Sequence, residues 1–401
     1  MNRTDAERAA LRDEIRTWLA EHVPRDWRAR MQGASREDYV AFQKTWFAAL
    51  RERGWAAPHW PVEDGGAGFD VRDQAAFYAE LAHVDAPRLS LYFVALNHVA
   101  ASLRYAGTEE QRHRFLPAIL DGQVWCQGFS EPEAGSDLVS LRTRAVRRGD
   151  EYVVNGHKIW SSRADSADWC LLLARTDPDA KPRNGLTYLL MDMTSPGITV
   201  RPIRQSSGSD EFCEMFLEDV VIPAENRLGP ENEGWAVAGA TLSTERGATM
   251  VELAERLAVQ FDDLVALARR ATDDDGNPVC VDSTVRQQVA ACDARVAAVR
   301  RLAAEVLERA ALGAELGAES SVIKLVYADA LRQVTRLGTM LEGMATLRYA
   351  APIAGAAWDA GSWLLDYMGS WAWSIAGGTN EIQRSIVGER ILGLPREPAA
   401  R

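Results

Sequence analysis

The sequence is poor in the features that mark secreted, metal-binding or membrane-embedded proteins. Its five cysteines are far apart and odd in number, and none forms a Cys-x-x-Cys pair, so neither a disulfide framework nor a zinc site is predicted. No uninterrupted apolar run is long enough to cross a bilayer. The first 18 residues are charged throughout and lack the apolar core of a signal peptide. We therefore expect a soluble, cytoplasmic protein without a metal.

Basic residues are also in deficit. The chain has 45 Lys and Arg against 57 Asp and Glu, a formal net charge of −12, which argues against a nucleic-acid groove. It has no GxGxxG motif after a strand and no GxxxxGK[ST], so neither a Rossmann dinucleotide site nor a P-loop is predicted. No Ser-His-Asp arrangement has a supporting local motif.

The 401 residues, 47% of them apolar, are enough for two or three domains with a large buried core. Apolar residues recur at helical spacing up to about residue 120, short β-type runs follow to about residue 226, and the helical period returns from Trp235. This pattern predicts an α+β multidomain fold. We expect an N-terminal all-α domain (1–122), a central antiparallel β-barrel domain (123–234) and a C-terminal domain resembling a four-helix bundle (235–401).

Several helix boundaries can be predicted from local signals. Asp5 is a candidate cap for the first helix, and Thr108-Glu-Glu is typical of a helix start that buries Phe115 and Leu116. The remaining expected helices are Arg72–Val84, Ser90–Tyr105, Ser283–Ala314, Glu319–Tyr349 and Asn380–Ile391.

The most informative segment is the polar stretch Gln127-Gly-Phe-Ser-Glu-Pro-Glu-Ala-Gly-Ser-Asp137. Pro132 and Gly135 favour an irregular backbone there, and the hydroxyls of Ser130 and Ser136 could hold anionic or carbonyl oxygens beside exposed N–H groups. By composition alone this segment is an ordinary polar loop.

Taken with two further motifs, this stretch resembles the signature of the acyl-CoA dehydrogenase family. Tyr152-Val-Val-Asn-Gly-His-Lys-Ile-Trp-Ser-Ser162 is similar to the family's strand-turn-strand motif, and Gly377-Gly-Thr-Asn-Glu-Ile-Gln-Arg384 is similar to its C-terminal motif. The resemblance spans nearly the whole chain. It implies an FAD-dependent enzyme that desaturates the Cα–Cβ bond of an acyl-CoA thioester.

The resemblance also implies roles for individual residues. Gln127 belongs to the loop that cradles the flavin, Trp160 would pack against the flavin ring, and Ser162 would replace the usual Thr near N5. From the residues alone, core packing is the simpler interpretation of Trp160. The other implied contacts are Phe129 and Ser130 along the isoalloxazine, Ser136 at the flavin or CoA phosphates, and Thr379 and Glu381 at FAD across a subunit interface.

The general base is not where most family members carry it. Gly377 stands where they have a Glu, so its backbone N–H could bind the thioester carbonyl but no side chain can take a proton. A minority of the family carries the base before an Arg on the first helix after the β domain. Thr244-Glu245-Arg246 matches that place. We predict that Glu245 is the base and that Arg246 reaches CoA, although a solvated Glu–Arg pair is the simpler interpretation of those residues alone.

The same resemblance implies partners and leaves alternatives open. An electron-transfer flavoprotein would reoxidise the flavin, and the chain would form a homodimer or homotetramer. The open space at Gly377 favours a branched or bulky acyl group. Three alternatives remain: an oxidase that uses O₂, a non-catalytic subunit of a heteromeric dehydrogenase, and a substrate carried by an acyl carrier protein.

Overall fold

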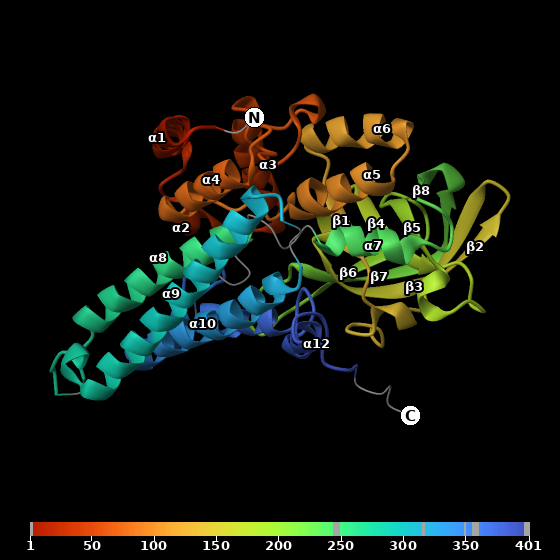
Figure 1. Cartoon of the computed structure of the whole chain (residues 1–401). Coiled ribbons are helices and arrows are strands. Elements are labelled where there is room, and N and C mark those ends of the chain that lie inside the picture. Colours follow the sequence, from red (N-terminus) through yellow and green to blue (C-terminus); the bar gives the residue numbers. More distant parts are fainter. Residues whose placement is uncertain are drawn as a thin grey trace. The chain divides into compact units, whose positions relative to one another are not determined.

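The computed structural model describes residues 3–243, 249–273, 275–314, 317–348, 350–354 and 361–396 (Figure 1). The chain divides into two compact units. The helical unit comprises Met1–Ala34, Phe69–Arg88 and Arg246–Arg401, and the sheet unit comprises Ser35–Gly68 and Leu89–Glu245. The predicted order of helices, then strands, then helices is confirmed, whereas the domain boundaries at 122 and 234 stay a prediction. None of the described helices is long and apolar enough to span a membrane.

The helical unit contains α1 (Asp5–His22), α2 (Trp27–Met31), α4 (Val71–His83), α8 (Thr249–Arg270), α9 (Ser283–Ala311), α10 (Glu319–Glu342), α11 (Trp363–Ser370) and α12 (Asn380–Arg390). The helices of the sheet unit are α3 (Arg36–Glu52), the π-helix η2 (Val94–Val99), α5 (Ala100–Ala106), α6 (Glu109–Leu120) and α7 (Gly234–Ser243). Its strands are β1 (Trp125–Gly128), β2 (Arg144–Arg148), β3 (Glu151–Ser162), β4 (Trp169–Arg175), β5 (Leu186–Asp192), β6 (Ile198–Ile203), β7 (Phe212–Pro223) and β8 (Arg227–Leu228).

Side-chain caps fix two of the predicted helix starts. Thr108 accepts the N–H of Gln111, whose side chain reaches back to the Thr108 N–H, so α6 begins with a complete capping box, as expected. Helix α1 has the same arrangement one residue earlier than predicted. Thr4 is its cap, and Asp5 is its first helical residue, where its charge favours the positive helix end.

The helix predicted over residues 90–105 is interrupted by the π-helix η2. The Asn97 side-chain amide donates to the Phe93 carbonyl at 2.9 Å. In a regular α-helix the backbone N–H of Asn97 would bind that carbonyl. This competition widens the turn before α5 begins, and such single π-turns occur often at functional sites.

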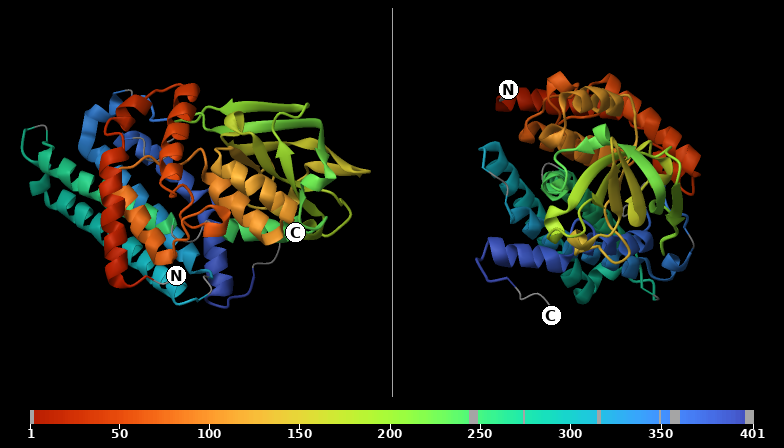
Figure 2. Two further views of the ribbon diagram at one scale, coloured as in Figure 1. Left: turned by 90° about the horizontal axis from the view of Figure 1, so that it is seen from above. Right: turned by 90° about the vertical axis from the view of Figure 1, so that its right-hand side faces the viewer.

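The strands form one eight-stranded sheet, which confirms the predicted central sheet domain. Most strand pairs are antiparallel, as predicted, but β1 pairs with β4 in parallel and the described strands do not close, so it is a curved open sheet rather than a barrel. The strand order is β6-β7-β3-β2-β4-β5-β8, with β1 beside β4, and the described path ends at β6 and β8 without closing. β1 runs parallel to β4, because the loop 129–143 and the β2–β3 hairpin form a crossover between them. The left and right views of Figure 2 show this curved sheet in yellow and green.

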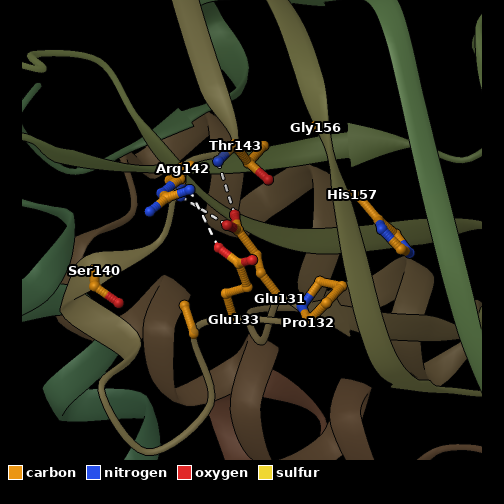
Figure 3. Close-up of a pocket in the computed structure, with 9 residues that line it drawn as sticks. Glu131, Pro132, Glu133, Ser140, Arg142, Thr143, Gly156 and His157 are labelled. Atoms are coloured by element: carbon orange, nitrogen blue, oxygen red, sulfur yellow. Dashed lines mark hydrogen bonds and ion pairs between the residues drawn. The ribbon is translucent and has the colours of Figure 1, made fainter.

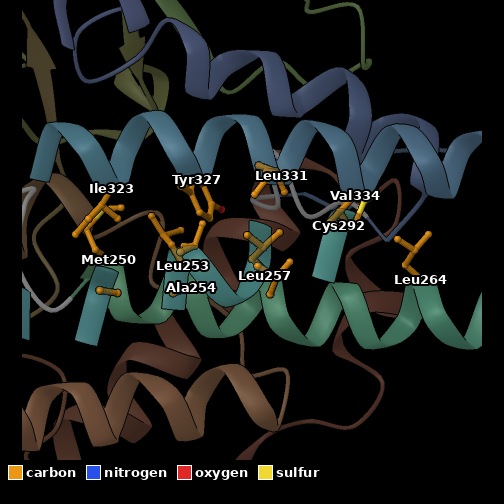
Figure 4. Close-up of a cluster of buried hydrophobic side chains, with 14 of the residues drawn as sticks. Met250, Leu253, Ala254, Leu257, Leu264, Cys292, Ile323, Tyr327, Leu331 and Val334 are labelled. Atoms are coloured by element: carbon orange, nitrogen blue, oxygen red, sulfur yellow. The ribbon is translucent and has the colours of Figure 1, made fainter. Parts of the chain in front are cut away.

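The core of the helical unit lies between its three longest helices. Met250, Leu253 and Leu257 on α8 meet buried side chains of α9 and α10, including Ile323 and Leu331 (Figure 4). Apolar residues recur on α8 and α10 every three or four positions, which gives each helix one buried stripe. α11 packs against α10, and α4 from the N-terminal segment packs against α8 and α9. The unit therefore needs residues from both ends of the chain.

Candidate functional site

The loop that follows β1 carries most of the predicted site residues of the sheet unit. Phe129 is buried with its ring edge-on to Tyr188, the ring centroids being 5.6 Å apart, and Ser130 is half-buried. The Gln127 side-chain nitrogen is buried without a hydrogen-bond acceptor among the described residues. A buried amide donor without an acceptor is costly, so this nitrogen points to a bound group that accepts.

Trp160 lies outside the core, so the core-packing interpretation is wrong for it. Its side chain is 55% exposed, although by strict alternation it would share the buried face of β3 with Tyr152 and Val154. The pairing of β3 with β7 slips between Lys158 and Ser161, and Trp160 adopts φ 63° at this bulge. Positive φ in a bulky residue is strained and clusters at ligand sites. The strain turns a large aromatic face towards solvent.

The backbone brings the loop and the bulge together. The Ile159 N–H donates to the Ser130 carbonyl at 2.9 Å, so Ser130 lies beside the residue that precedes Trp160. Phe212 on β7 packs edge-on against Trp160 with ring centroids 6.0 Å apart, and Ser162 pairs with Phe212 in the β3–β7 ladder. The structure therefore gathers four predicted residues into one region, namely Phe129, Ser130, Trp160 and Ser162.

A buried ion pair beneath this region was not predicted. Lys158 is fully buried, and its Nζ donates to Glu131 Oε1 and to the Phe129 carbonyl, each at 2.9 Å. Glu131 also accepts the backbone N–H groups of Arg142 and Thr143, both at 2.7 Å. Burial lowers the pKa of the Lys158 ammonium from 10.5 to about 8, and the Glu131 charge offsets part of that fall. Burial alone would raise the pKa of Glu131, but the Lys158 charge and the N–H donors outweigh burial and lower it.

A shallow pocket of about 390 Å³ opens on the outer side of the same loop. Glu133 and Arg142 form an exposed ion pair at its rim, with 3.2 Å between Glu133 Oε2 and Arg142 Nη1 (Figure 3). His157 lines the β3 side of the pocket and pairs with Glu214 on β7. Ser136 is exposed in the loop, next to the stretch that lines the pocket.

The C-terminal motif forms a loop of two glycines before α12 in the helical unit. Gly377 and Gly378 have φ 63° and 86°, a left-handed backbone conformation that residues other than glycine rarely adopt. Gln383 Nε2 donates to the Gly377 carbonyl at 2.8 Å, and Lys324 Nζ on α10 donates to the Gly378 carbonyl at 2.8 Å. Burial lowers the pKa of Lys324 to about 8. Because side chains from α12 and α10 bind the two carbonyls, these hydrogen bonds stabilise the backbone conformation of the loop.

The two residues predicted to contact FAD from this motif lie at the start of α12. The Thr379 hydroxyl accepts the Ile382 N–H at 3.3 Å and caps the helix. Glu381 is exposed in the first turn, where hydrogen bonds to the helix start and to Thr379 lower its carboxyl pKa. Their contact with a cofactor stays a prediction.

The predicted base lies outside the described residues. Neither Glu245 nor Arg246 is among them; the described part of α7 reaches Ser243 and α8 resumes at Thr249. Both roles therefore stay predictions.

Sequence reasoning missed four residues that hold these loops: Glu131, Lys158, Lys324 and Gln383. The sequence held a signal for Lys158. By alternation it shares the face of β3 that buries Val154, and a Lys on a buried face is unusual and requires a partner. The pairing of Lys324 with the Gly377–Gly378 loop spans more than 50 residues and left no local pattern.

The residues gathered at the bulge fit a flavin. The exposed indole of Trp160 offers an aromatic face, the Gln127 amide is a buried donor without an acceptor among the described residues, and Ser130 and Ser162 add two hydroxyls on the neighbouring backbone. A flavin ring has an apolar surface and several polar edge atoms, which matches this combination.

Comparison with known proteins gives one family for most of the chain. Its three domain descriptions match consecutively: acyl-CoA dehydrogenase, N-terminal domain (residues 5–123), middle domain (126–220) and C-terminal domain (232–392). The acyl-CoA dehydrogenase IpdE1 of Mycolicibacterium smegmatis is 36% identical, covering 96% of this chain and 98% of that protein. FadE34 of Mycobacterium tuberculosis is 37% identical over 87% of this chain and 46% of its own length.

Solved structures agree with the sequence comparison. The structure described as the Tcur3481-Tcur3483 steroid ACAD has a TM-score of 0.84 and 31% identity, and it covers 99% of this chain and 100% of its own. The ChsE4-ChsE5 complex from Mycobacterium tuberculosis has a TM-score of 0.82 and 29% identity, with the same coverage. The chain therefore belongs to the acyl-CoA dehydrogenase family of flavin-dependent oxidoreductases.

Proposed function

We propose that this chain is an FAD-dependent dehydrogenase that introduces an α,β double bond into an acyl-CoA thioester with a bulky, steroid-derived acyl group. The observation that carries the flavin part of the proposal is the strained, exposed Trp160 beside the Gln127–Ser130 loop. The steroid part is supported by the likeness to a structure described as a steroid ACAD. The absence of a side chain at Gly377, where most of the family carries a carboxylate, also supports a bulky group.

The residues of the sheet unit would hold and orient the cofactor. Trp160 would present its ring face to the isoalloxazine, and Gln127 and Ser130 would donate to polar atoms of the flavin. Ser162 offers a hydroxyl near N5. FAD, when bound, supplies the acceptor for the hydride that leaves the β-carbon. The Ser162 hydroxyl would serve as a hydrogen-bond donor to the bound flavin.

Proton removal falls to the carboxylate of Glu245. Its oxygen takes the α-proton, and the electron pair of that C–H bond moves towards the thioester carbonyl. The backbone N–H of Gly377 donates to the carbonyl oxygen and stabilises the developing enolate. The left-handed backbone of Gly377 is compatible with this division of labour, since a glutamate there would be strained.

The electron acceptor and the assembly are part of the same proposal. An electron-transfer flavoprotein takes the electrons onward, as the family resemblance implies. Two of the similar solved structures are described by two component names, Tcur3481-Tcur3483 and ChsE4-ChsE5. This favours a second, different subunit in the active assembly over the homodimer or homotetramer of our sequence-based expectation.

The test is anaerobic titration of the purified protein, alone and with its partner subunit, with straight-chain, branched and steroid-derived acyl-CoA thioesters. Bleaching of the flavin by the bulky thioesters is expected, and a preference for short straight chains would overturn the substrate class. Glu245→Gln should keep its yellow colour and lose flavin reduction by roughly a hundredfold or more, as removal of a general base does. Glu233→Gln, the same change at an exposed position just before α7, is the matched control. Near-normal reduction in Glu245→Gln would place the base elsewhere.

A further inference from the structure

The buried Glu131–Lys158 pair has no part in the chemistry described so far. It joins three segments of the sheet unit: the loop after β1, the chain at residues 142–143 and strand β3. Lys158 is 0% exposed and Glu131 is 9% exposed, so both charges have left bulk water. Replacing a buried ion pair by apolar groups of similar size is often neutral or stabilising, so stability alone does not explain why the pair is there.

The geometry indicates what the pair does instead. Lys158 Nζ holds the Phe129 carbonyl at 2.9 Å, and that carbonyl belongs to the peptide group between Phe129 and Ser130. No described peptide bond is cis, and in a trans peptide the N–H and C=O point in opposite directions. The Lys158 contact therefore fixes where the Ser130 N–H points. Glu131 keeps the ammonium in place and is itself held by two backbone N–H groups.

We propose that Glu131 and Lys158 are positioning residues that set the orientation of the Phe129–Ser130 peptide, so that the loop presents a fixed donor to the flavin. This rests on the proposed function in that it takes the Gln127–Ser136 loop as the flavin-binding loop. Neither side chain touches the reacting atoms. Their effect is on cofactor affinity and on the electronic surroundings of the flavin.

Variants separate orientation from stability. Lys158→Met alone leaves a buried carboxylate without its cation and is expected to fold poorly. The double variant Glu131→Gln/Lys158→Met removes both charges together, so it leaves no uncompensated buried charge and should fold, with an unfolding midpoint lowered only by the loss of the hydrogen bond to the Phe129 carbonyl. It should nevertheless bind FAD at least tenfold more weakly, with a shifted flavin absorption spectrum, because the Phe129 carbonyl has lost its donor. Arg147→Met and Glu231→Gln are the matched controls, since they break a partly exposed pair in the same sheet, 47% and 28% exposed.

The wild type supplies a second readout that needs no variant. The groups that act on the Lys158 ammonium are the Glu131 carboxylate and the Cys170 thiol. Loss of the ammonium proton above pH 8 weakens the hold on the Phe129 carbonyl, so FAD affinity should fall between pH 7 and pH 9.5. The double variant should lack this pH dependence, whereas Arg147→Met should keep it.

FAD dissociation constants from flavin fluorescence, measured on the full chain across this pH range, decide the question. A double variant that binds FAD as tightly as the wild type overturns the positioning role. A wild-type chain that holds no FAD at any pH, alone or with its partner subunit, instead overturns the proposed function.

Discussion

Replacing Gly377 by glutamate tests whether the backbone of this chain still accepts a base at the position that most family members use. Gly377 adopts φ 63°, and a residue with a Cβ pays about 1 to 2 kcal/mol for a left-handed conformation. If the backbone turns to negative φ instead, it gives up the 2.8 Å hydrogen bond from Gln383 to the Gly377 carbonyl, which contributes about 1 kcal/mol. Either way, we expect Gly377→Glu to lower the free energy of unfolding by about 1 to 2 kcal/mol.

The same substitution should not restore catalysis. In the Glu245→Gln background, Gly377→Glu puts a carboxylate at the usual family position, but on a backbone conformation that favours glycine. We therefore expect the rate of flavin reduction to stay within about tenfold of that of the Glu245→Gln single variant. Stopped-flow reduction under anaerobic conditions and denaturant unfolding are the measurements. Ala376→Glu, an exposed neighbour without positive φ, is the control and should change stability by less than about 0.5 kcal/mol. Recovery of wild-type reduction with unchanged stability would refute the backbone argument.

Three other outcomes can be checked independently. Trp160→Ala should lower FAD affinity while it changes the stability of the flavin-free protein by less than about 0.5 kcal/mol, because the side chain is 55% exposed; a large loss of stability would mean that the ring belongs to the core. Lys324→Met should slow flavin reduction more than it weakens FAD binding, because it frees the Gly378 carbonyl, and equal effects on both would contradict that role. Burial lowers the pKa of His59 from 6.5 to about 4, so the unfolded state takes up a proton first and stability should fall as the pH drops from 6.5 to 4. His59→Gln should remove this pH dependence in thermal unfolding curves, and an unchanged dependence would assign it to another group.

The parts of the fold that follow from local chemistry could be predicted from the sequence. The capping box at Thr108 and Gln111 uses residues three apart, so the start of α6 was readable, and the change from helical to β-type spacing located the sheet. Whether the sheet closes could not be predicted from the sequence, because closure depends on pairing between edge strands from distant parts of the chain. The parallel β1–β4 pairing joins residues more than 40 positions apart, and no local pattern encodes it.

The candidate site shows the same division. The family motifs identified the loop at Gln127 and the glycines at 377 and 378. The usual burial of tryptophan gave the wrong environment for Trp160, since a bulge in β3 changes the register without a local signal in the sequence. The ion pair beneath the loop escaped notice for a related reason. Lysine side chains are usually solvated, so Lys158 is recognised as buried only once its position in β3 is known. Its partner Glu131 lies 27 residues earlier, so no local pattern links the two.

The helical unit is assembled from stretches at both ends of the chain, and this has a consequence for its synthesis. Helices α1 and α4 leave the ribosome long before α8, α9 and α10, against which α4 packs. At ordinary translation speeds, the roughly 160 residues between Arg88 and Thr249 take about 8 to 30 s to appear. During that interval the face of α4 that packs against α8 and α9 has no C-terminal helix to cover it. The nascent polypeptide is thus a natural client for chaperones, and a version that stops near residue 243 would expose that face permanently.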